Sequence, residues 1–268
     1  MADATVIASF YKRIDYLKLV LAGFERQTIK KFEVILADDG SSENIFREIE
    51  SISKNYSYHI KHIWQEDKGF RKNKILNQAI LAANSNYLIF IDADCIPHSR
   101  FVEEHIKNKS QGVSLTGRRV NLSEKITTQL TADKIKEGFL ESRISLLITD
   151  GLFGKSYDVE KGFYFENSFL RNYFNKKSRG LLGCNFSIHK ADILRINGFD
   201  ERYEAPSIGE DSDVQFRLEL IGIKIKSINN IAVQYHLYHK MQERPQKNLD
   251  LFEEVKKSSL AFTPFGIK

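Results

Sequence analysis

Two carboxylates, Asp92 and Asp94, follow directly on the apolar run Tyr87–Ile91. Such a run, bounded upstream by the polar residues Asn84–Asn86, is typical of a strand buried on both faces of a parallel sheet. Residues with alternate numbers on a strand share a face, so both carboxylates can point toward one ligand. Adjacent carboxylates repel unless a cation or a proton lies between them, and hard oxygen ligands suit Mg²⁺ or Mn²⁺. The pair therefore indicates a metal site or, because Asp-x-Asp is common, a solvated turn.

A second acidic pair, Asp38 and Asp39, ends the apolar run Phe32–Ala37 and is followed by Gly40–Ser42. This composition is that of a turn and a helix N-cap. A carboxylate at a strand end could also accept hydrogen bonds from a nucleobase imide or a ribose hydroxyl. The sequence contains neither Gly-x-Gly-x-x-Gly nor Gly-Lys-Ser/Thr, so a nucleotide's phosphates would be held by a metal and side chains.

A third acidic pair, Glu210 and Asp211, follows Gly209 at the start of an expected helix through Leu220. Carboxylates favour the positive end of a helix, which is a sufficient structural reason for them. A carboxylate there could instead deprotonate a hydroxyl nucleophile, provided that it is ionised and within hydrogen-bond reach.

Two basic features could complete such a site. His236 follows the apolar run Ile231–Tyr235 and could add an imidazole to the metal ligands, although a lone histidine is more often structural. Arg71 lies in the basic loop Gly69–Lys74, which is either a solvated helix start or an anion clamp for a diphosphate, and its fork suits paired oxygens. The sole tryptophan, Trp64, is expected in the core.

The elements that must position these residues alternate between strands and helices in the first half of the chain. The pattern predicts a mostly parallel central sheet flanked by helices, an α/β fold that binds ligands at the carboxyl ends of its strands. Polar residues 9–13, 38–42 and 92–94 fall on that edge. The expected strands are Thr5–Phe10, Phe32–Ala37, His59–Trp64 and Tyr87–Ile91, and the expected helices are Asp15–Gln27, Ile45–Ile52 and Lys72–Ala83.

The second half is less regular. Residues 121–178 are mixed polar and aromatic, and we interpret them as shaping the second substrate's pocket or as a structural insert. We expect one domain over 1–240, with a nucleotide-binding half at 1–119 and an acceptor-binding half at 120–240, and a tail at 241–268. The expected elements are a strand at Val113–Arg119, helices near Lys134–Ile148 and from Lys190, and strands at Lys224–Ile228 and Ile231–Tyr235.

Composition limits the classes of function. Of 268 residues, 42% are hydrophobic and 28% charged, as in a globular protein. No apolar run approaches the roughly 18 residues that cross a bilayer, and two cysteines without paired spacing favour a cytoplasmic setting. A net charge of +5 is too dispersed to indicate nucleic acid, and it fits an anionic small substrate or the inner face of a membrane. The basic and aromatic tail indicates peripheral membrane contact or, more commonly, a docked helix.

Four motifs follow one another along the chain: Ile7–Arg13 with Gln27-Thr28, Leu36–Ser42, Phe90–Asp94, and Gly183–Ser187 with Gly198–Glu201 and Gly209–Asp211. In this order they resemble the inverting family 2 nucleotide-sugar glycosyltransferases, from Thr5 to about His239. The resemblance implies a Rossmann-like nucleotide-diphospho-sugar transferase fold of the GT-A type. Two departures stand out: Leu76-Asn77 replaces an Arg-Asn pair of many members, and the Gln-x-x-Arg-Trp of processive synthases with a membrane channel is absent.

The resemblance implies roles on the donor side. Ser9, Tyr11 and Asp39 would contact a uridine, with Asp38 beside them. Asp92 would hold the ribose. With Arg71 added from the basic loop, these residues form the expected nucleotide site.

The resemblance also implies the metal and the base. Asp94 and His236 would hold Mn²⁺ or Mg²⁺ on the diphosphate. Asp211 would be the general base, with Glu210 helping to place the acceptor.

The resulting hypothesis is metal-dependent, inverting transfer of a sugar from a nucleotide sugar, with UDP favoured, to a hydroxyl of a glycan or glycolipid acceptor. Bacterial capsule or lipopolysaccharide synthesis is the setting that the resemblance suggests. Two alternatives stay open. One is a nucleotidyltransferase that makes sugar nucleotides, and the other is a non-catalytic sugar-binding module of the same fold.

Overall fold

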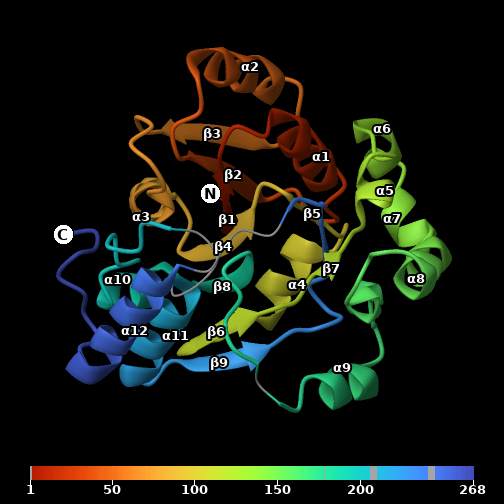
Figure 1. Cartoon of the computed structure of the whole chain (residues 1–268). Coiled ribbons are helices and arrows are strands. Elements are labelled where there is room, and N and C mark those ends of the chain that lie inside the picture. Colours follow the sequence, from red (N-terminus) through yellow and green to blue (C-terminus); the bar gives the residue numbers. More distant parts are fainter. Residues whose placement is uncertain (1, 178, 206–209, 241–244) are drawn as a thin grey trace.

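A central sheet of seven strands is covered by helices on both faces (Figure 1). The structure is a computed structural model that describes residues 2–177, 179–205, 210–240 and 245–268. Gly209 and Arg244 lie outside the described residues. Among the described residues, no helix is both long and apolar enough to cross a bilayer.

The order of the main sheet is β3-β2-β1-β4-β8-β6-β9. The first four strands are parallel, with Ile7 opposite both Ile35 and Phe90. The prediction of a mostly parallel α/β sheet is confirmed. The strands are β1 (Ala4–Phe10), β2 (Phe32–Asp38), β3 (His59–Trp64), β4 (Tyr87–Asp92), β6 (Val113–Thr116), β8 (Asn185–His189) and β9 (Lys224–Ser227).

Strand β8 runs antiparallel to both of its neighbours, β4 and β6. The rings of Phe90 and Phe186, which face each other across β4 and β8, stack with centroids 4.4 Å apart. A second sheet, in the order β5-β10-β7, lies beside the end of β4. Its strands are β5 (Cys95–Pro97), β7 (Val120–Asn121) and β10 (Gln234–His236).

Alternation along the strands explains why both faces carry helices. Val6 belongs to the hydrophobic core that also contains Leu17 of α1, whereas Ile7 belongs to a second core with Ile75 of α3. The helices of the first half and of the insert are α1 (Ile14–Glu25), α2 (Glu43–Ser53), α3 (Lys72–Ala82), α4 (Phe101–Asn108), α5 (Glu124–Thr127), α6 (Ala132–Lys136), α7 (Phe139–Ser142), α8 (Ile144–Phe153), the 3₁₀ helix η1 (Val159–Gly162) and α9 (Ser168–Phe174).

Three helices follow β8 in the part of the chain that the structure describes. They are α10 (Lys190–Arg195), α11 (Glu210–Leu220) and α12 (Gln246–Ser258). The tail contains a docked helix, because the ring of Phe252 in α12 meets that of Phe216 in α11 edge to face at 6.3 Å.

The expected helices near Lys134–Ile148 are confirmed as α6, α7 and α8, and the first division falls at Gly138, whose φ of +80° leaves the helical region. One expected element is wrong in detail. The expected strand at 231–235 starts only at Gln234, because the amides of Ile231 and Ala232 both turn back to the carbonyl of Ile228. Both residues are buried, so their apolar character reflects burial in a turn rather than a strand.

Candidate active site

The turns after β1, β2 and β3 meet at the carboxyl edge of the sheet. The backbone amide of Lys12 donates to Ser41 Oγ at 2.9 Å, and Trp64 Nε1 donates to the carbonyl of Ser41 at 2.9 Å. The ring of Trp64 is 43% exposed, so its expected place in the core is wrong. Tyr11 is also exposed, and its hydroxyl donates to Asp67 at 3.0 Å. Two aromatic side chains thus border this edge.

Asp38 and Asp39 are both buried in this edge but make different contacts. Asp38 accepts from the Ser41 amide at 2.9 Å and lies 3.0 Å from His62 Nε2. Asp39 accepts from Gln65 Nε2 at 2.5 Å and from the Arg71 amide at 2.8 Å. Burial raises the pKa of Asp39, although both hydrogen bonds oppose that shift. Asp38 thus holds its own turn together, and Asp39 ties the turn to the basic loop.

Asp92 ends β4 beside Ser9 of β1. Ser9 Oγ donates to Asp92 Oδ1 at 2.5 Å. Lys72 Nζ, in the first turn of α3, lies 3.0 Å from the same oxygen and 2.9 Å from Glu210 Oε1 at the start of α11. A single ammonium therefore connects the acidic motif of β4 with the acidic motif of α11.

Glu210 is strongly desolvated in this arrangement. Burial raises the pKa of Glu210, and the attraction of Lys72 offsets only part of that shift. Its second oxygen, Oε2, is buried and has no hydrogen-bond partner among the described residues. An acceptor hydroxyl is one group that could satisfy it.

Asp94 lies in the turn between β4 and β5, opposite two imidazoles. Its Oδ2 is 3.5 Å from His236 Nε2 and 3.4 Å from His239 Nε2, and Cys95 Sγ lies 3.3 Å from its Oδ1. Burial would raise the pKa of Asp94, but the hydrogen bonds from the two histidines hold it well below its usual range. The bond to Asp94 raises the pKa of His239.

This cluster is positioned by the small sheet. His236 pairs with Cys95 across β5 and β10, and the Leu237 amide donates to the Asp94 carbonyl at 2.8 Å. Ligand atoms of Asp94, Cys95 and His236 lie within 4.8 Å of one another. A carboxylate with imidazoles is a donor set that suits Mn²⁺, so the residues present fit a divalent cation.

Asp211 lies in the first turn of α11. Its Oδ2 accepts from the Gly183 amide at 3.2 Å, and its Oδ1 accepts from the Ser212 amide at 2.8 Å. Gly183 belongs to the loop before β8. The loop and the helix together orient the carboxylate that the sequence singles out as a base.

The sequence did not single out Lys72, His239 and Arg119. Lys72 is adjacent to the chosen Arg71, whose own guanidinium instead donates to the Glu66 carbonyl. Arg119 lies 3.4 Å from Cys184 Sγ, and although burial opposes it, the surrounding thiols and carboxylates raise its pKa. Weak signals were present: a lysine in a basic loop, a histidine three residues after His236, and a basic pair at the end of an expected strand.

Comparison with known proteins identifies the class. The model of "Glycosyl transferase family 2" matches residues 5–174, and a model described as "N-terminal domain of galactosyltransferase" matches residues 165–240. The chain therefore belongs to glycosyltransferase family 2. It is a glycosyltransferase, and the family resemblance read from its motifs is confirmed.

Individual relatives of known activity are similar to this chain over most of its length. The chain is 29% identical to chondroitin synthase of Escherichia coli over 91% of its length, and 24% identical to hyaluronan synthase of Pasteurella multocida over 95%. It spans only 35% and 26% of those two proteins.

Solved structures share the fold. GalNAc-T7 with UDP, GalNAc and Mn²⁺ matches 96% of the chain with a TM-score of 0.64 and 13% identity, over 48% of that protein. Staphylococcus aureus TarS 1–349 with UDP-GlcNAc matches 97% with a TM-score of 0.60 and 16% identity, over 65% of that protein. The GT-A type of fold is confirmed by these likenesses.

Proposed function

We propose that this chain is a metal-dependent, inverting glycosyltransferase that moves a sugar from a UDP-sugar to a hydroxyl of a glycan or glycolipid acceptor. The observation that carries the proposal is the bridge of Lys72 between Asp92 and Glu210, because it joins a donor-side and an acceptor-side carboxylate at one edge of the sheet. The bound UDP-GlcNAc of TarS and the UDP and Mn²⁺ of GalNAc-T7 support this choice of donor and cation.

The nucleotide would occupy the edge formed by the first three strands. Tyr11 offers an exposed ring for the base, and Asp39, with Asp38 beneath it, offers the carboxylate for the uracil or ribose. Ser9 would act through Asp92, which it orients. Arg71 is proposed for the phosphates, although its guanidinium would have to leave the Glu66 carbonyl.

Asp94, His236 and His239 would hold the cation. A divalent ion bound there would neutralise charge that develops on the departing diphosphate. The deprotonated state of Asp94, favoured by the two histidines, is the state that ligates a metal.

Asp211 would take the proton of the attacking hydroxyl. The hydroxyl attacks the anomeric carbon from the face opposite the nucleotide, so an α-linked donor gives a β-linked product. Glu210 would accept a hydrogen bond from the acceptor through its free oxygen, and Lys72 would keep its other oxygen in place. Loss of a positioned general base typically costs 10²- to 10⁴-fold in rate.

The similarity to a chondroitin synthase and a hyaluronan synthase supports a polysaccharide acceptor, and we propose a role in synthesis of a bacterial surface polysaccharide such as a capsule or lipopolysaccharide. We further propose that 1–119 provides most of the donor site and 120–240 the acceptor site. Peripheral contact with the inner face of a membrane is part of the same proposal.

The test is turnover with a panel of nucleotide sugars, with Mn²⁺ omitted and then restored. Free nucleoside diphosphate and a new glycoside are expected only with the metal. Asp211→Asn should lower transfer by at least about 10²-fold while UDP binding, measured by calorimetry, is retained. Asp250→Asn, on the exposed side of α12, is the matched control and should transfer normally.

The outcomes separate the alternatives. Release of pyrophosphate would indicate a nucleotidyltransferase, and binding of sugar without turnover would indicate a binding module. If Asp211→Asn lost both UDP binding and sugar transfer, the assignment of Asp211 as the general base would be contradicted.

A further inference from the structure

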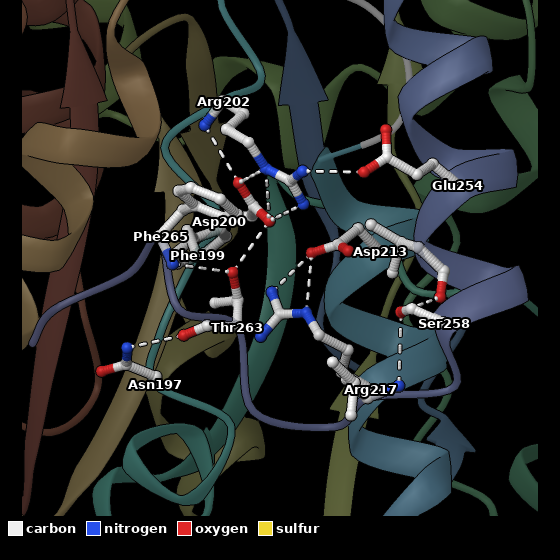
Figure 2. Close-up of polar contacts among 12 residues, drawn as sticks. Asn197, Phe199, Asp200, Arg202, Asp213, Arg217, Glu254, Ser258, Thr263 and Phe265 are labelled. Atoms are coloured by element: carbon white, nitrogen blue, oxygen red, sulfur yellow. Dashed lines mark hydrogen bonds and ion pairs between the residues drawn. The ribbon is translucent and has the colours of Figure 1, made fainter.

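Residues 259–268, named here the strap, lie along residues 196–205, the segment that leads from α10 toward Glu210. Figure 2 shows the central part of this contact. Five hydrogen bonds donated by backbone or side-chain amide groups join the two segments, and they keep polar groups of both segments satisfied. They are Thr263 N to Ile196 O (3.3 Å), Asn197 Nδ2 to Thr263 O (2.7 Å), Glu201 N to Phe265 O (2.9 Å), Ile267 N to Asn197 O (3.1 Å) and Lys268 N to Asn197 Oδ1 (3.1 Å).

A side-chain contact joins the two segments at their centre. Thr263 Oγ1 donates to Asp200 Oδ2 at 2.8 Å, and Arg202 Nη2 lies 2.8 Å from the same oxygen (Figure 2). The guanidinium of Arg202 also covers the Phe265 ring at 4.1 Å. Asp200 is only 1% exposed, so the threonine hydroxyl is one of few groups that can satisfy it.

At Gly266 the strap approaches this segment more closely than any residue with a Cβ atom would allow. A Cβ added at Gly266 would lie 1.9 Å from the carbonyl oxygen of Asn197. Glycine is therefore required there for the contact.

The opposite side of the segment is held by α11, the helix that carries Asp211. Arg217 Nη1 donates to the carbonyls of Ile196 and Gly198 at 2.7 and 2.9 Å. Arg217 is itself paired with Asp213 at 2.5 Å, and both side chains are almost fully buried (Figure 2). Through Arg217 the segment is thus tied to Asp213 in the first turn of α11.

The segment is also held by α3, the helix that carries Lys72. Asn73 Nδ2 donates to the Asp200 carbonyl at 2.7 Å, and Asn77 Nδ2 donates to the Phe199 carbonyl at 2.9 Å. Residues 196–205 thus lie between the strap and the two helices whose first turns supply Lys72, Glu210 and Asp211.

We propose that the strap is a positioning device for the acceptor side of the active site, and that Thr263 and Asp200 are its positioning residues. By fixing 196–205 against α3 and α11, they set the place of Asp211 relative to the donor. The inference rests on the proposed function, in which Asp211 is the base. Misplacement of a reacting group by about 1 Å can cost up to about 10²-fold in rate without a loss of binding.

The test compares Thr263→Val with Thr263→Ser. The valine variant removes the hydroxyl at nearly constant shape and should lower kcat for sugar transfer by about tenfold. Its KM for the donor and its Kd for UDP with Mn²⁺ should be unchanged, and the serine variant should transfer normally. Thr149→Val on the exposed side of α8 is the matched control, because it loses only a bond to its own helix.

Gly266→Ala provides a second variant that displaces the strap without touching the Asp200 pair. It should show the same loss of kcat with retained UDP binding. Wild-type transfer by both Thr263→Val and Gly266→Ala would overturn the proposal, and so would a parallel loss of transfer, UDP binding and folded signal in circular dichroism. If the wild-type chain transfers no sugar, or Asp211→Asn transfers normally, the proposed function fails instead.

Discussion

Lys72 pairs with a carboxylate from each of two acidic motifs of the proposed site, Asp92 of β4 and Glu210 of α11. Replacing Lys72 by Met leaves Asp92 and Glu210 without their shared cation, and we expect transfer to fall by about 10²-fold, as when one preorganised charge donor is removed from an active site. Steady-state kcat and KM check this. The matched control is Lys68→Met, which removes an exposed lysine that pairs with the exposed Glu66 and should leave turnover unchanged.

The pH dependence of the Lys72 variant gives a second readout of the same substitution. Burial already raises the pKa of Glu210, and Lys72 lowers it. Removal of Lys72 should therefore raise the pKa of Glu210 further. The acid limb of the kcat profile should move to higher pH, because the protonated form of Glu210, which we expect to be inactive, persists to higher pH. An acid limb that stays in place would show that Glu210 is not the titrating group.

His239 should contribute to metal affinity together with His236. We expect His239→Ala to raise the Mn²⁺ concentration for half-maximal transfer by at least about tenfold, a loss of the size seen when even outer partners of metal ligands are removed. Titration of transfer activity with Mn²⁺ at a saturating donor concentration measures this half-maximal Mn²⁺ concentration. His59→Ala, on the exposed side of β3, should not change the metal requirement; an unchanged requirement in His239→Ala would exclude that residue as a ligand.

The sequence was informative about residues that end strands and poor for residues whose place depends on the fold. Asp92 and Asp94 could be assigned to one edge because strand periodicity orients them. Lys72 could not be preferred over Arg71, since only the three-dimensional position of α11 shows which of two neighbouring cations meets Glu210. His239 lies beyond the last strand, where no periodicity applies.

At the scale of elements, Glu141 of α7 fastens the insert to the main domain. It accepts from both terminal nitrogens of Arg26, at 2.6 and 3.0 Å, and from the amide and hydroxyl of Ser99 at 2.9 and 3.0 Å. We expect Glu141→Gln to lower the free energy of unfolding by about 2 kcal/mol at pH 7, the order expected for a partly buried ion pair with hydrogen bonds. Urea denaturation checks this against Glu137→Gln, an exposed control.

The sign of the pH dependence of this stabilisation follows from the pKa shift of Glu141. Burial would raise the pKa of Glu141, but the hydrogen bonds from Arg26 and Ser99 hold it below the ordinary value. The stabilisation is therefore present above the unfolded pKa of about 4.3 and is lost as the pH falls through the lower folded pKa. The difference between wild type and Glu141→Gln should narrow as the pH is taken from 7 toward 3, and a constant difference would contradict this account.

The elements with a regular period were predicted well, and those governed by turns were not. The first four strands agree with the expectation to within a residue or two. Burial along nearly the whole strand gives β1, β2 and β4 apolar runs, whereas the residues of β3 are all exposed or only part-buried. The small sheet was missed because β5 and β7 are too short to show a period. The antiparallel direction of β8 leaves no local trace in its sequence, since a buried strand has the same pattern in either direction.

At the scale of the whole molecule, donor binding should stabilise the fold only when the metal site is filled. With Mn²⁺, UDP at a hundredfold its dissociation constant should raise the free energy of unfolding by about 2.7 kcal/mol. Thermal denaturation with and without a chelator measures this, and CDP at the same concentration is the matched control for the base. An equal shift for UDP with and without Mn²⁺ would contradict the proposed metal-diphosphate contact.

The place of β8 in the sheet also bears on synthesis of the chain. The edge of β4 that ends at Asp92 stays unpaired until Asn185 and the rest of β8 have emerged from the ribosome. At ordinary rates of elongation this takes roughly 5 to 20 s. During that interval the nascent chain presents a long apolar strand edge, the kind that pairs with other chains. Premature termination anywhere between β4 and β8 should therefore yield an aggregating fragment, which makes the translation speed of this stretch a determinant of yield.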